Sequence, residues 1–549
     1  MKSVTIVFLL YVSIFLSAQN PQPSRPADFV PYHYRFTVEQ LKNKYSDNIM
    51  KKAAAERAAM REVIDKGPYK ATYESIDNHP LPEWFRDVKF GIFYDWGIYS
   101  VAGHGEPGYH DNLYPDCYLC FINDNTNAQE YHKNVWGEDF KRDDFIPLFK
   151  ATGFDAEKLA QQCVKWGAKY VVPFCRHACD GYSLWDNSYS QRDAVDMYPG
   201  RDLVKEMYDA FRKYQLKCGF YTLVYDFEYP VLLNNKILIR TTEATSDPSV
   251  NLAGYIPFDS KVDNRMISGK IPVQDYFNDY FVPSTKEFID RYDPDILWFD
   301  AEWYNTAAYN KTDLLTTYFF NNAAGRKEVV VNDRLGTDSR EKHGDIYTSE
   351  GFVIIENFGH YWEENIPMGF SYGYNWEEND QTLMTAEHLI EMLVRIVARN
   401  GNLMLLINPD GQGELSAVQV DRLDEIGKWL EVNGEGIYKT RFAPVQNDPS
   451  NSGDNVWYTL SKDEKYIYAH FFEWPEKGSL LFKKLNPKWE TDAYLLGYDK
   501  PLKWYELSGN EGGIISWLPE GMTEDTAPCK YAWCIRFEWD KDNQYGSGK

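Results

Sequence analysis

Apolar runs and amphipathic stretches alternate along the chain between residues 81 and 440. Several apolar runs are apolar throughout, which is typical of strands in a parallel sheet covered on both faces. We predict strands at Lys89–Tyr94, Tyr170–Phe174, Cys218–Val224, Ile296–Phe299, Val329–Asn332, Val353–Ile355 and Leu403–Ile407. Helical patterns lie between them, for example Ala156–Trp166, Asp202–Tyr214, Val282–Tyr292 and Ala386–Ala398. These repeated units predict an α/β fold, a (β/α)8-type barrel with long loops. A doubly wound sheet is the alternative, but no G-x-G-x-x-G motif opens a helix.

The pattern differs on either side of this region. Residues 19–80 form a predicted N-terminal helical segment, with a highly charged helix from Thr37 to Lys66 that ends at Gly67-Pro68. A further helix, Ala417–Val432, closes the barrel region. Residues 441–549 predict a C-terminal antiparallel β-sandwich, because short alternating runs are broken by Gly, Pro, Asp and Asn. Those runs are Val456–Leu460, Tyr466–Phe471, Ala493–Leu496 and Tyr531–Phe537.

The first 18 residues resemble a secretory signal peptide. Lys2 precedes a mostly apolar run from Val4 to Leu16, and Ser17-Ala18 offer small residues before Gln19. A short membrane anchor is the alternative, but the run falls short of the ~20 residues that a membrane span needs. We therefore expect an exported protein, periplasmic or secreted, with no membrane span in the mature chain.

Charge and aromatic content narrow the class of ligand. The chain has 58 basic and 82 acidic side chains, a net charge of −24, and no run of Lys or Arg that would follow a phosphate backbone. Nucleic acid is therefore not an expected partner. Aromatic residues make up 16% of the chain. Aromatic rings stack on the C–H faces of sugars and carboxylates accept from their hydroxyls, which favours an oligosaccharide or polysaccharide.

Eight cysteines raise the question of a metal site. Cys117-x-x-Cys120 and Cys175-x3-Cys179 could each supply half of a zinc site, with His177 nearby. Their spacing lacks the regular pairing of a zinc finger, so buried free thiols or one or two disulfides are favoured. We predict no metal.

Polar residues follow the predicted strands, where a barrel places its reacting groups. They are Asp95-Trp96-Gly97, Arg176-His177, Asp180-Gly181, Tyr225-Asp226, Asp300-Ala301-Glu302-Trp303, Asn332-Asp333-Arg334 and Glu356-Asn357. Carboxylates and aromatics dominate, and the motifs of serine hydrolases, zinc proteases and phosphate loops are missing. Two carboxylates flanking a bond are what acetal hydrolysis requires. Asp300 is the strongest candidate because the apolar Ile-Leu-Trp-Phe precedes it.

Ordered matches over about residues 80–440 point to one family. They are Lys89–Val101, Gly137–Phe140, Phe154–Glu157, Gly167–Val172, Asp180–Asp186, Arg201–Val204, Pro294–Asp300, Val331–Arg334, Ser371–Asn375, Asn400–Leu403 and Trp429–Tyr438. On these stretches the chain resembles glycoside hydrolase family 29, the α-L-fucosidases and their relatives. The resemblance implies a barrel followed by a C-terminal β-domain, in agreement with the independent interpretation above.

The resemblance also implies catalytic roles. Asp300 aligns with the nucleophile of a retaining double displacement. Glu363, in a Trp-Glu pair eight residues before Ser371, matches the acid/base, with Glu364, Glu356 and Glu350 as alternatives. Glu363 would have to stay protonated near neutrality, about 5–5.5 Å from Asp300. Arg334 aligns with an arginine that would keep the nucleophile ionised. Two carboxylates supply this chemistry, so no cofactor is expected.

The sugar-binding positions depart from the family pattern. Asp95-Trp96-Gly97 replaces His-Trp-Gly, Asp116-Cys117-Tyr118 replaces Glu-Trp-Tyr, Arg176-His177-Ala178-Cys179 replaces a pair of histidines, and Tyr372 replaces a tryptophan. Most of the usual imidazole donors are therefore gone. The predicted substrate-binding residues are Asp95, Trp96, Asp116, Arg176, His177, Tyr221, Trp298, Arg334 and Tyr372.

Three functions remain open. The preferred hypothesis is a retaining exo-α-L-glycosidase that releases a terminal α-L-fucose or fucose-configured sugar. The second is an α-L-galactosidase acting on L-galactose or L-galactose-6-sulfate of algal galactans, with Arg176 able to pair with the sulfate. The third, from another class, is a glycan-binding module without catalysis.

Overall fold

The computed structural model describes residues 20–108, 112–240, 255–258, 264–350, 359–450, 453–507 and 513–541. The predicted signal peptide and the predicted strand Val353–Ile355 lie outside these residues. No helix in the described part of the chain combines the length and the apolar character needed to cross a membrane.

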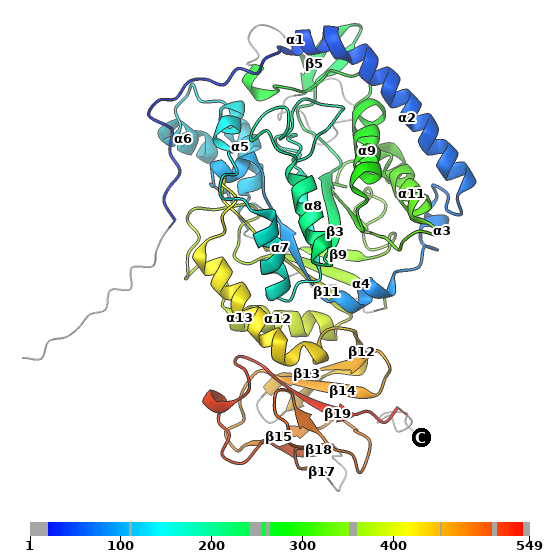
Figure 1. Ribbon diagram of the computed structural model, residues 1–549, viewed down its shortest axis with the longest axis vertical. Helices are drawn as coiled ribbons and strands as arrows, with labels where there is room; N and C mark the ends of the chain where they lie inside the picture. Colours follow the sequence, from blue (N-terminus) through cyan, green and yellow to red (C-terminus); the bar gives the residue numbers. More distant parts are fainter. Residues whose placement is uncertain are drawn as a thin grey trace, which may run out of the picture.

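Eight parallel strands form a barrel, as the sequence predicts (Figure 1). Each strand pairs with the next barrel strand along the chain, and the last pairs with the first, Phe93 lying opposite Leu406. A bridge between Asn332 and Ile346 joins the two edges of the sheet. The strands are β1 (Phe90–Tyr94), β2 (Tyr170–Arg176), β3 (Lys217–Leu223), β7 (Ile296–Asp300), β8 (Val330–Val331), β9 (Tyr347–Glu350), β10 (Trp362–Pro367) and β11 (Gly401–Ile407).

Aromatic side chains fill the barrel below its carboxyl end. The ring centroids of Phe93 and Phe174 are 4.6 Å apart, those of Phe174 and Tyr221 are 3.8 Å apart, and Trp298 lies 5.3 Å from Phe93. These rings make a floor beneath the strand ends. Because successive side chains of a strand point to opposite faces, the inward position of Phe93 also turns Asp95 inward.

Helices cover the outside of the barrel. They are α7 (Ala156–Lys165), α8 (Leu203–Lys213), α9 (Val282–Tyr292), α11 (Thr312–Ala323), α12 (Ala386–Ala398) and α13 (Ala417–Asn433). Four of them begin at a side chain that accepts a backbone N–H of the first turn: Asp155, Asp202, Thr385 and Ser416. Such caps satisfy donors that the helix itself leaves open. The predicted helices are therefore present within a residue or two at each end.

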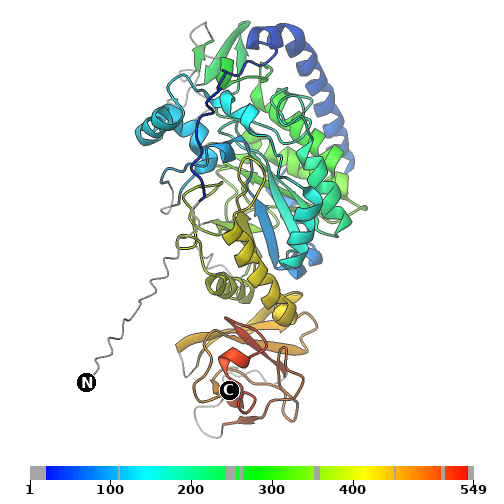
Figure 2. The ribbon, with the colours of Figure 1, turned by 60° about the vertical axis from the view of Figure 1, so that its left-hand side comes forward.

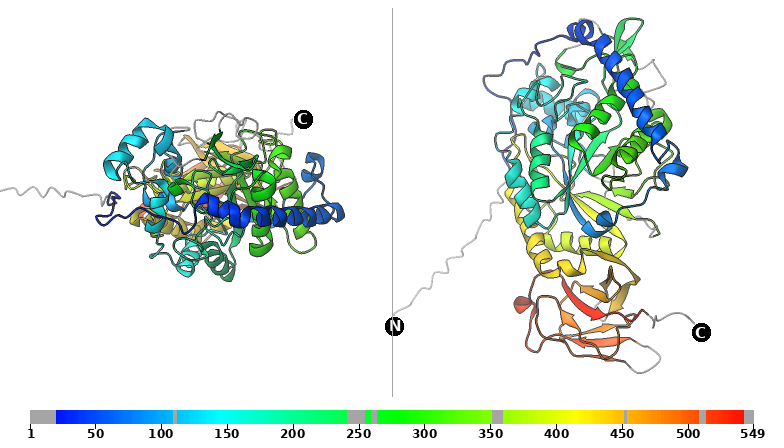
Figure 3. Two further views of the ribbon diagram at one scale, coloured as in Figure 1. Left: turned by 90° about the horizontal axis from the view of Figure 1, so that it is seen from above. Right: turned by 45° about the vertical axis from the view of Figure 1, so that its right-hand side comes forward.

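The N-terminal helical segment lies along the side of the barrel. Helix α1 (Val38–Leu41), the π-helical turn η1 (Lys42–Ser46) and α2 (Asp47–Lys66) follow one another without a break, as predicted. Figure 3 shows α2 crossing the outer face next to the helices α9 and α11. A small antiparallel sheet of β4 (Val231–Leu233), β5 (Lys236–Arg240) and β6 (Tyr255–Pro257) was not predicted.

The C-terminal region is an antiparallel sandwich with its own apolar core. One sheet contains β12 (Thr440–Ser450), β13 (Gly453–Ser461), β14 (Tyr466–Phe471), β19 (Trp533–Glu538) and β16 (Tyr494–Leu495). The other contains β15 (Ser479–Phe482), β18 (Ile514–Trp517) and β17 (Trp504–Glu506). Helices α12 and α13 lie between this sandwich and the barrel (Figure 2). The indole N–H of Trp429 on α13 donates to the carbonyl of Ala532 at 2.7 Å, which ties the two parts together.

Candidate active site

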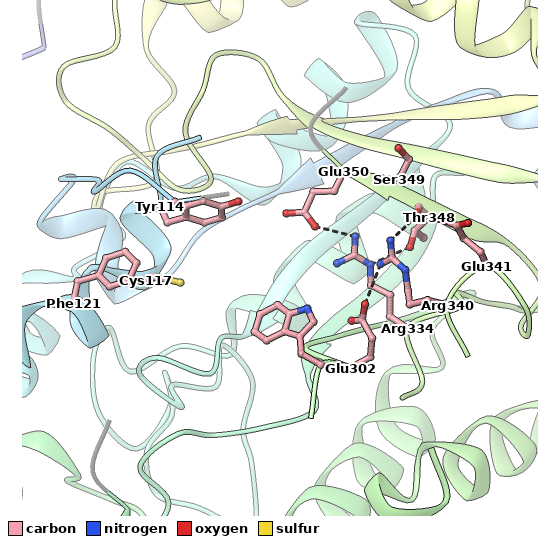
Figure 4. A pocket seen from close by; sticks show the side chains of 12 residues that line it. Tyr114, Cys117, Phe121, Glu302, Arg334, Arg340, Glu341, Thr348, Ser349 and Glu350 are labelled. Carbon is pink, nitrogen blue, oxygen red and sulfur yellow. Dashed lines mark hydrogen bonds and ion pairs between the residues drawn. The ribbon is translucent and has the colours of Figure 1, made fainter. Parts of the chain in front are cut away.

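A cavity of about 650 Å³ opens at the carboxyl ends of the barrel strands. This is the end at which barrel enzymes carry their reacting groups. Its walls come from segments far apart in the chain (Figure 4): Gly108, Tyr114, Cys117, Phe121, Glu302, Trp303, Arg334, Arg340, Glu341, Thr348, Ser349 and Glu350.

Arg334 is the central cation of this site. Its Nη1 donates to Asp300 Oδ1 at 2.7 Å, its Nη2 to Glu350 Oε2 at 3.0 Å, and its Nε to Thr348 Oγ1 at 3.0 Å. The side chain is only 2% exposed, and its guanidinium lies 4.8 Å from the ring centre of Trp298. Burial alone would lower the pKa of Arg334, but the charges of Asp300 and Glu350 raise it well above its ordinary value. A fixed guanidinium therefore links carboxylates on two strands.

Asp300 ends β7 with its side chain 16% exposed. Tyr221 O–H donates to Oδ2 at 2.7 Å, while Arg334 holds Oδ1. Burial would raise the pKa of Asp300, but the Arg334 charge and the donated hydrogen bonds outweigh it, so the pKa is lowered. The next residue, Ala301, has a left-handed φ of 65°, which turns the chain sharply as the strand ends. The hydrogen bonds from Arg334 and Tyr221 therefore favour the ionised form of this carboxylate.

Glu302 and Trp303 are two of the lining residues that the predicted set does not contain. Glu302 accepts from Arg340 Nη1 at 3.1 Å, and burial raises its pKa. Trp303 lines the same cavity and is 54% exposed, which is unusual for so large an apolar ring. Both stand in the polar segment after Asp300, so position after a buried strand was the signal that could have found them. The exposed ring is available to stack on a sugar.

An acidic group of side chains lies beside Asp300. Asp95 accepts from Tyr99 O–H at 2.6 Å, and burial raises its pKa to about 7. Asp116 lies close enough to Asp95 and Asp300 that their charges add to burial in raising its pKa well above the ordinary value. His177 Nε2 is 3.4 Å from Asp116 Oδ2, and burial lowers the pKa of this imidazole to about 4. The structure therefore brings Asp95, Asp116 and His177, three of the predicted substrate-binding residues, close together.

Two predicted binding residues point away from the cavity. Trp96 packs on Phe149 and Phe154 and donates to the carbonyl of Asp410 at 2.8 Å, because it alternates with the inward Asp95. Arg176 donates to Thr222 Oγ1 at 2.9 Å and its guanidinium lies 5.2 Å from the ring centre of Tyr280, on the outer side of β2. The prediction that these two bind substrate is wrong, since the pleat of each strand turns them outward.

The other predicted binding residues lie under or behind the cavity wall. Trp298 belongs to the aromatic floor and donates from Nε1 to Glu363 at 3.0 Å. Tyr221 binds Asp300, as described. Tyr372 stacks on Tyr114, with ring centroids 5.5 Å apart and an angle of 12° between the planes. Tyr372 therefore supports the wall that Tyr114 presents to the cavity.

The four acid/base candidates occupy different positions. Glu363 has no exposed surface, accepts from Tyr170 O–H at 2.6 Å, and has its pKa raised to about 7 by burial. Because Glu363 pairs with Thr348 and Asn365 pairs with Glu350, Glu363 lies two residues deeper in the barrel than Glu350. Glu350 is 26% exposed and lines the cavity. Glu364 is buried and is not among the lining residues, and Glu356 lies outside the described residues.

The cysteines come together only in part. All eight are free thiols. Donor atoms of Cys117, His177 and Cys179 lie within 4.8 Å of one another, whereas Cys175 donates to the carbonyl of Pro173. The two half-sites that the spacing indicated are therefore not joined as pairs, and the three clustered side chains are the described residues best placed to hold a metal.

A barrel with carboxylates gathered at its carboxyl end has the architecture of a glycoside hydrolase. The family model of Alpha-L-fucosidase matches residues 57–435, and the model of the Alpha-L-fucosidase C-terminal domain matches residues 446–538. The chain belongs to the α-L-fucosidase family.

Named relatives and solved structures agree with this assignment. The chain is 31% identical over 479 residues to the Alpha-L-fucosidase of Dictyostelium discoideum, covering 85% of this chain and 95% of that protein. It is 33% identical over 474 residues to the Plasma alpha-L-fucosidase of Homo sapiens, covering 85% and 92%. The structure of Thermotoga maritima alpha-fucosidase in complex with fucose matches with a TM-score of 0.69 at 27% identity, over 85% of this chain and all of that one.

Proposed function

We propose that this glycoside hydrolase is a retaining exo-α-L-glycosidase that releases a terminal α-L-fucose, or a sugar of the same configuration, from a glycan. The observation that carries the proposal is the single guanidinium of Arg334, which holds Asp300 and Glu350 at one cavity. The two hydrogen bonds keep the bonded carboxylate oxygens no more than about 8 Å apart, an upper bound that is compatible with the separation of about 5–5.5 Å in retaining enzymes.

Asp300 is the nucleophile. Its ionised oxygen attacks the anomeric carbon as the bond to the leaving oxygen breaks, which forms a glycosyl-enzyme ester. Water then attacks the same carbon, releases Asp300 and restores the original anomeric configuration. The lowered pKa of Asp300 supports this role, because a nucleophilic carboxylate must carry its charge before substrate arrives.

Glu350 is the acid/base. It delivers a proton to the leaving oxygen and later removes one from the incoming water. Glu350 lies on β9, which β8 separates from β7 and Asp300, and it lines the cavity, whereas Glu302 follows two residues after the end of β7. We assign nucleophilic attack to Asp300, whose pKa is lowered, and proton transfer to Glu350, which lines the cavity and is 26% exposed. Glu363 has the raised pKa expected of an acid, but it has no exposed surface and cannot contact a substrate in the cavity. Contact with the substrate takes precedence over pKa in this assignment.

The neighbouring acidic group supports a hydroxyl-rich sugar. Asp95 Oδ2 and Asp116 Oδ1 are buried and lack a hydrogen-bond partner of good geometry among the described residues. Sugar hydroxyls can donate to such oxygens. Each buried oxygen that is left without a hydrogen bond costs about 1–3 kcal/mol. Arg176, the cation predicted to pair with a sulfate, is held on the outer side of β2. A terminal sugar without sulfate is therefore favoured, and the surplus of acceptors supports L-galactose, which adds a hydroxyl at C6, as the second candidate.

The decisive experiment compares 4-nitrophenyl α-L-fucoside with the α-L-galactoside. Wild type should release nitrophenol, and Asp300→Ala should lower the rate by at least 10³-fold. Azide should restore Glu350→Ala and yield the α-configured glycosyl azide, because azide then attacks the glycosyl-enzyme. Turnover of the galactoside alone would select the second candidate. Glycan binding without turnover of either substrate would replace both by the binding-module hypothesis.

Export is part of the proposal. The predicted signal peptide at residues 1–18 supports secretion or a periplasmic location, where glycans are available as substrates. Fractionation of the producing cell and N-terminal sequencing of the mature protein test this expectation. A mature protein that still begins at Met1 would contradict it.

A further inference from the structure

Three donor side chains meet at the wall of the cavity. Cys117, which lines the cavity, ends the short helical turn η4 (Pro115–Cys117), and His177 and Cys179 follow β2. One donor atom of each lies within 4.8 Å of the other two. His177 and Cys179 are at least nine-tenths buried. Segments some 60 residues apart in the sequence thus converge with two sulfurs and an imidazole.

The surroundings of His177 resemble those of a metal-binding histidine. Its Nε2 faces Asp116 Oδ2 at 3.4 Å, and its Nδ1 is buried without a hydrogen-bond partner among the described residues. Histidines that bind a metal through one ring nitrogen commonly donate the other N–H to a carboxylate, which fixes the tautomer and the ring. Asp116 lies on the Nε2 side of the ring, and Nδ1 is the ring nitrogen without a partner among the described residues.

We propose that Cys117, His177 and Cys179 bind one zinc ion in the wall of the active-site cavity. Two thiolates and an imidazole are a donor set that Zn²⁺ favours, and three protein ligands leave one tetrahedral position for a fourth. The two thiols lose their protons on binding, so the site with Zn²⁺ carries no net charge. Cys120 interacts electrostatically with Cys179 but does not belong to the cluster of three. The ionised Asp300, whose charge acts on His177, favours a cation over an anion at this place.

The ion would act on the shape of the cavity. The segment that ends at Cys117 also supplies Tyr114 to the cavity wall and Asp116 to the acidic group. A bond from this segment to Cys179 would fix it against the carboxyl end of β2. Zinc therefore has a positioning role here, separate from the acid, base and nucleophile.

The test uses the full mature chain, reduced and freed of metal with a chelator, and titrated with Co²⁺ as a spectroscopic probe for Zn²⁺. Wild type should bind one equivalent and develop a near-ultraviolet thiolate-to-cobalt charge-transfer band. Cys179→Ser should lose roughly half of that intensity and bind at least tenfold more weakly, since one of two thiolates is gone. Zn²⁺ should displace Co²⁺ and abolish the band.

Cys163→Ser is the matched control. Cys163 is a fully buried thiol on α7 outside the cluster, so this variant should keep the wild-type band. Circular dichroism establishes that each variant is folded, and His177→Ala replaces Cys179→Ser if the latter is not. A wild type without the band, an unchanged band in both cluster variants, or a Cys117–Cys179 disulfide in peptides of the purified protein would overturn the proposal. These readouts need no turnover, so they are independent of the proposed glycosidase activity.

Discussion

Replacing Glu363 by glutamine should remove a loss of folding stability that occurs as the pH rises, and should leave catalysis nearly unchanged. Glu363 is fully buried, with Tyr170 O–H at 2.6 Å from one oxygen and Trp298 Nε1 at 3.0 Å from the other. Glutamine keeps this shape and remains neutral. Its oxygen can accept from Trp298, and its amide can donate to the Tyr170 oxygen.

The size of the effect follows from the pKa of Glu363, which burial raises from 4.5 to about 7. A carboxyl whose folded pKa exceeds its unfolded pKa binds its proton more tightly in the folded state. Its contribution to stability is therefore full below pH 4.5 and is lost as the pH rises through 7. The loss amounts to about 3 kcal/mol, which the glutamine variant should not suffer.

Urea unfolding at pH 5 and pH 8 measures this difference for wild type and Glu363→Gln. The variant should gain about 2.5 kcal/mol relative to wild type on going from pH 5 to pH 8, because part of the loss has already occurred at pH 5. Its kcat/KM on the fucoside should stay within about threefold of wild type, while Glu350→Gln, the matched control, should lose 10² or more. If Glu363→Gln instead loses activity to that extent and azide restores it, Glu363 is the acid/base and the geometric reasoning is refuted.

Three further substitutions test the site and the domain contact. Tyr221→Phe removes a hydrogen-bond donor to the ionised Asp300. It should therefore shift the acid limb of the pH profile of kcat/KM up by about one pH unit, and an unshifted acid limb would contradict the role of that hydrogen bond. Arg334→Lys cannot bridge two carboxylates and should lower kcat/KM by about 10²-fold, so a variant within threefold of wild type would exclude the shared guanidinium as a requirement. Trp429→Phe leaves a backbone carbonyl of the C-terminal domain unpaired and should cost about 1–3 kcal/mol in thermal unfolding without changing kcat, whereas the exposed Trp489→Phe should cost little.

The barrel was predictable wherever its strands are apolar. Five-residue runs such as Ile296–Asp300 are buried on both faces, and their mostly apolar composition predicts this burial. Strand β10 was missed because Trp-Glu-Glu-Asn is polar, and its glutamates are covered only by partners such as Tyr170 and Trp298 on other strands. A buried polar group needs hydrogen-bond partners, and when these come from segments far away in the sequence, the local sequence pattern does not predict the burial.

At the site, the sequence determined the kinds of groups that end each strand. Asp300 after a buried strand, Arg334 after the next, and the family resemblance were all available from the order of residues. The tertiary structure decided which of these groups meet. Strand pleating turned Asp95 inward and Trp96 outward. The register of β9 against β10 put Glu350 at the cavity and Glu363 two residues deeper, and the approach of two loops placed Cys117 beside Cys179. The physical reason is that the type of each residue can be read from the sequence alone. The direction in which a side chain points, its depth in the barrel and its neighbours are fixed only when the strands pair around a closed barrel.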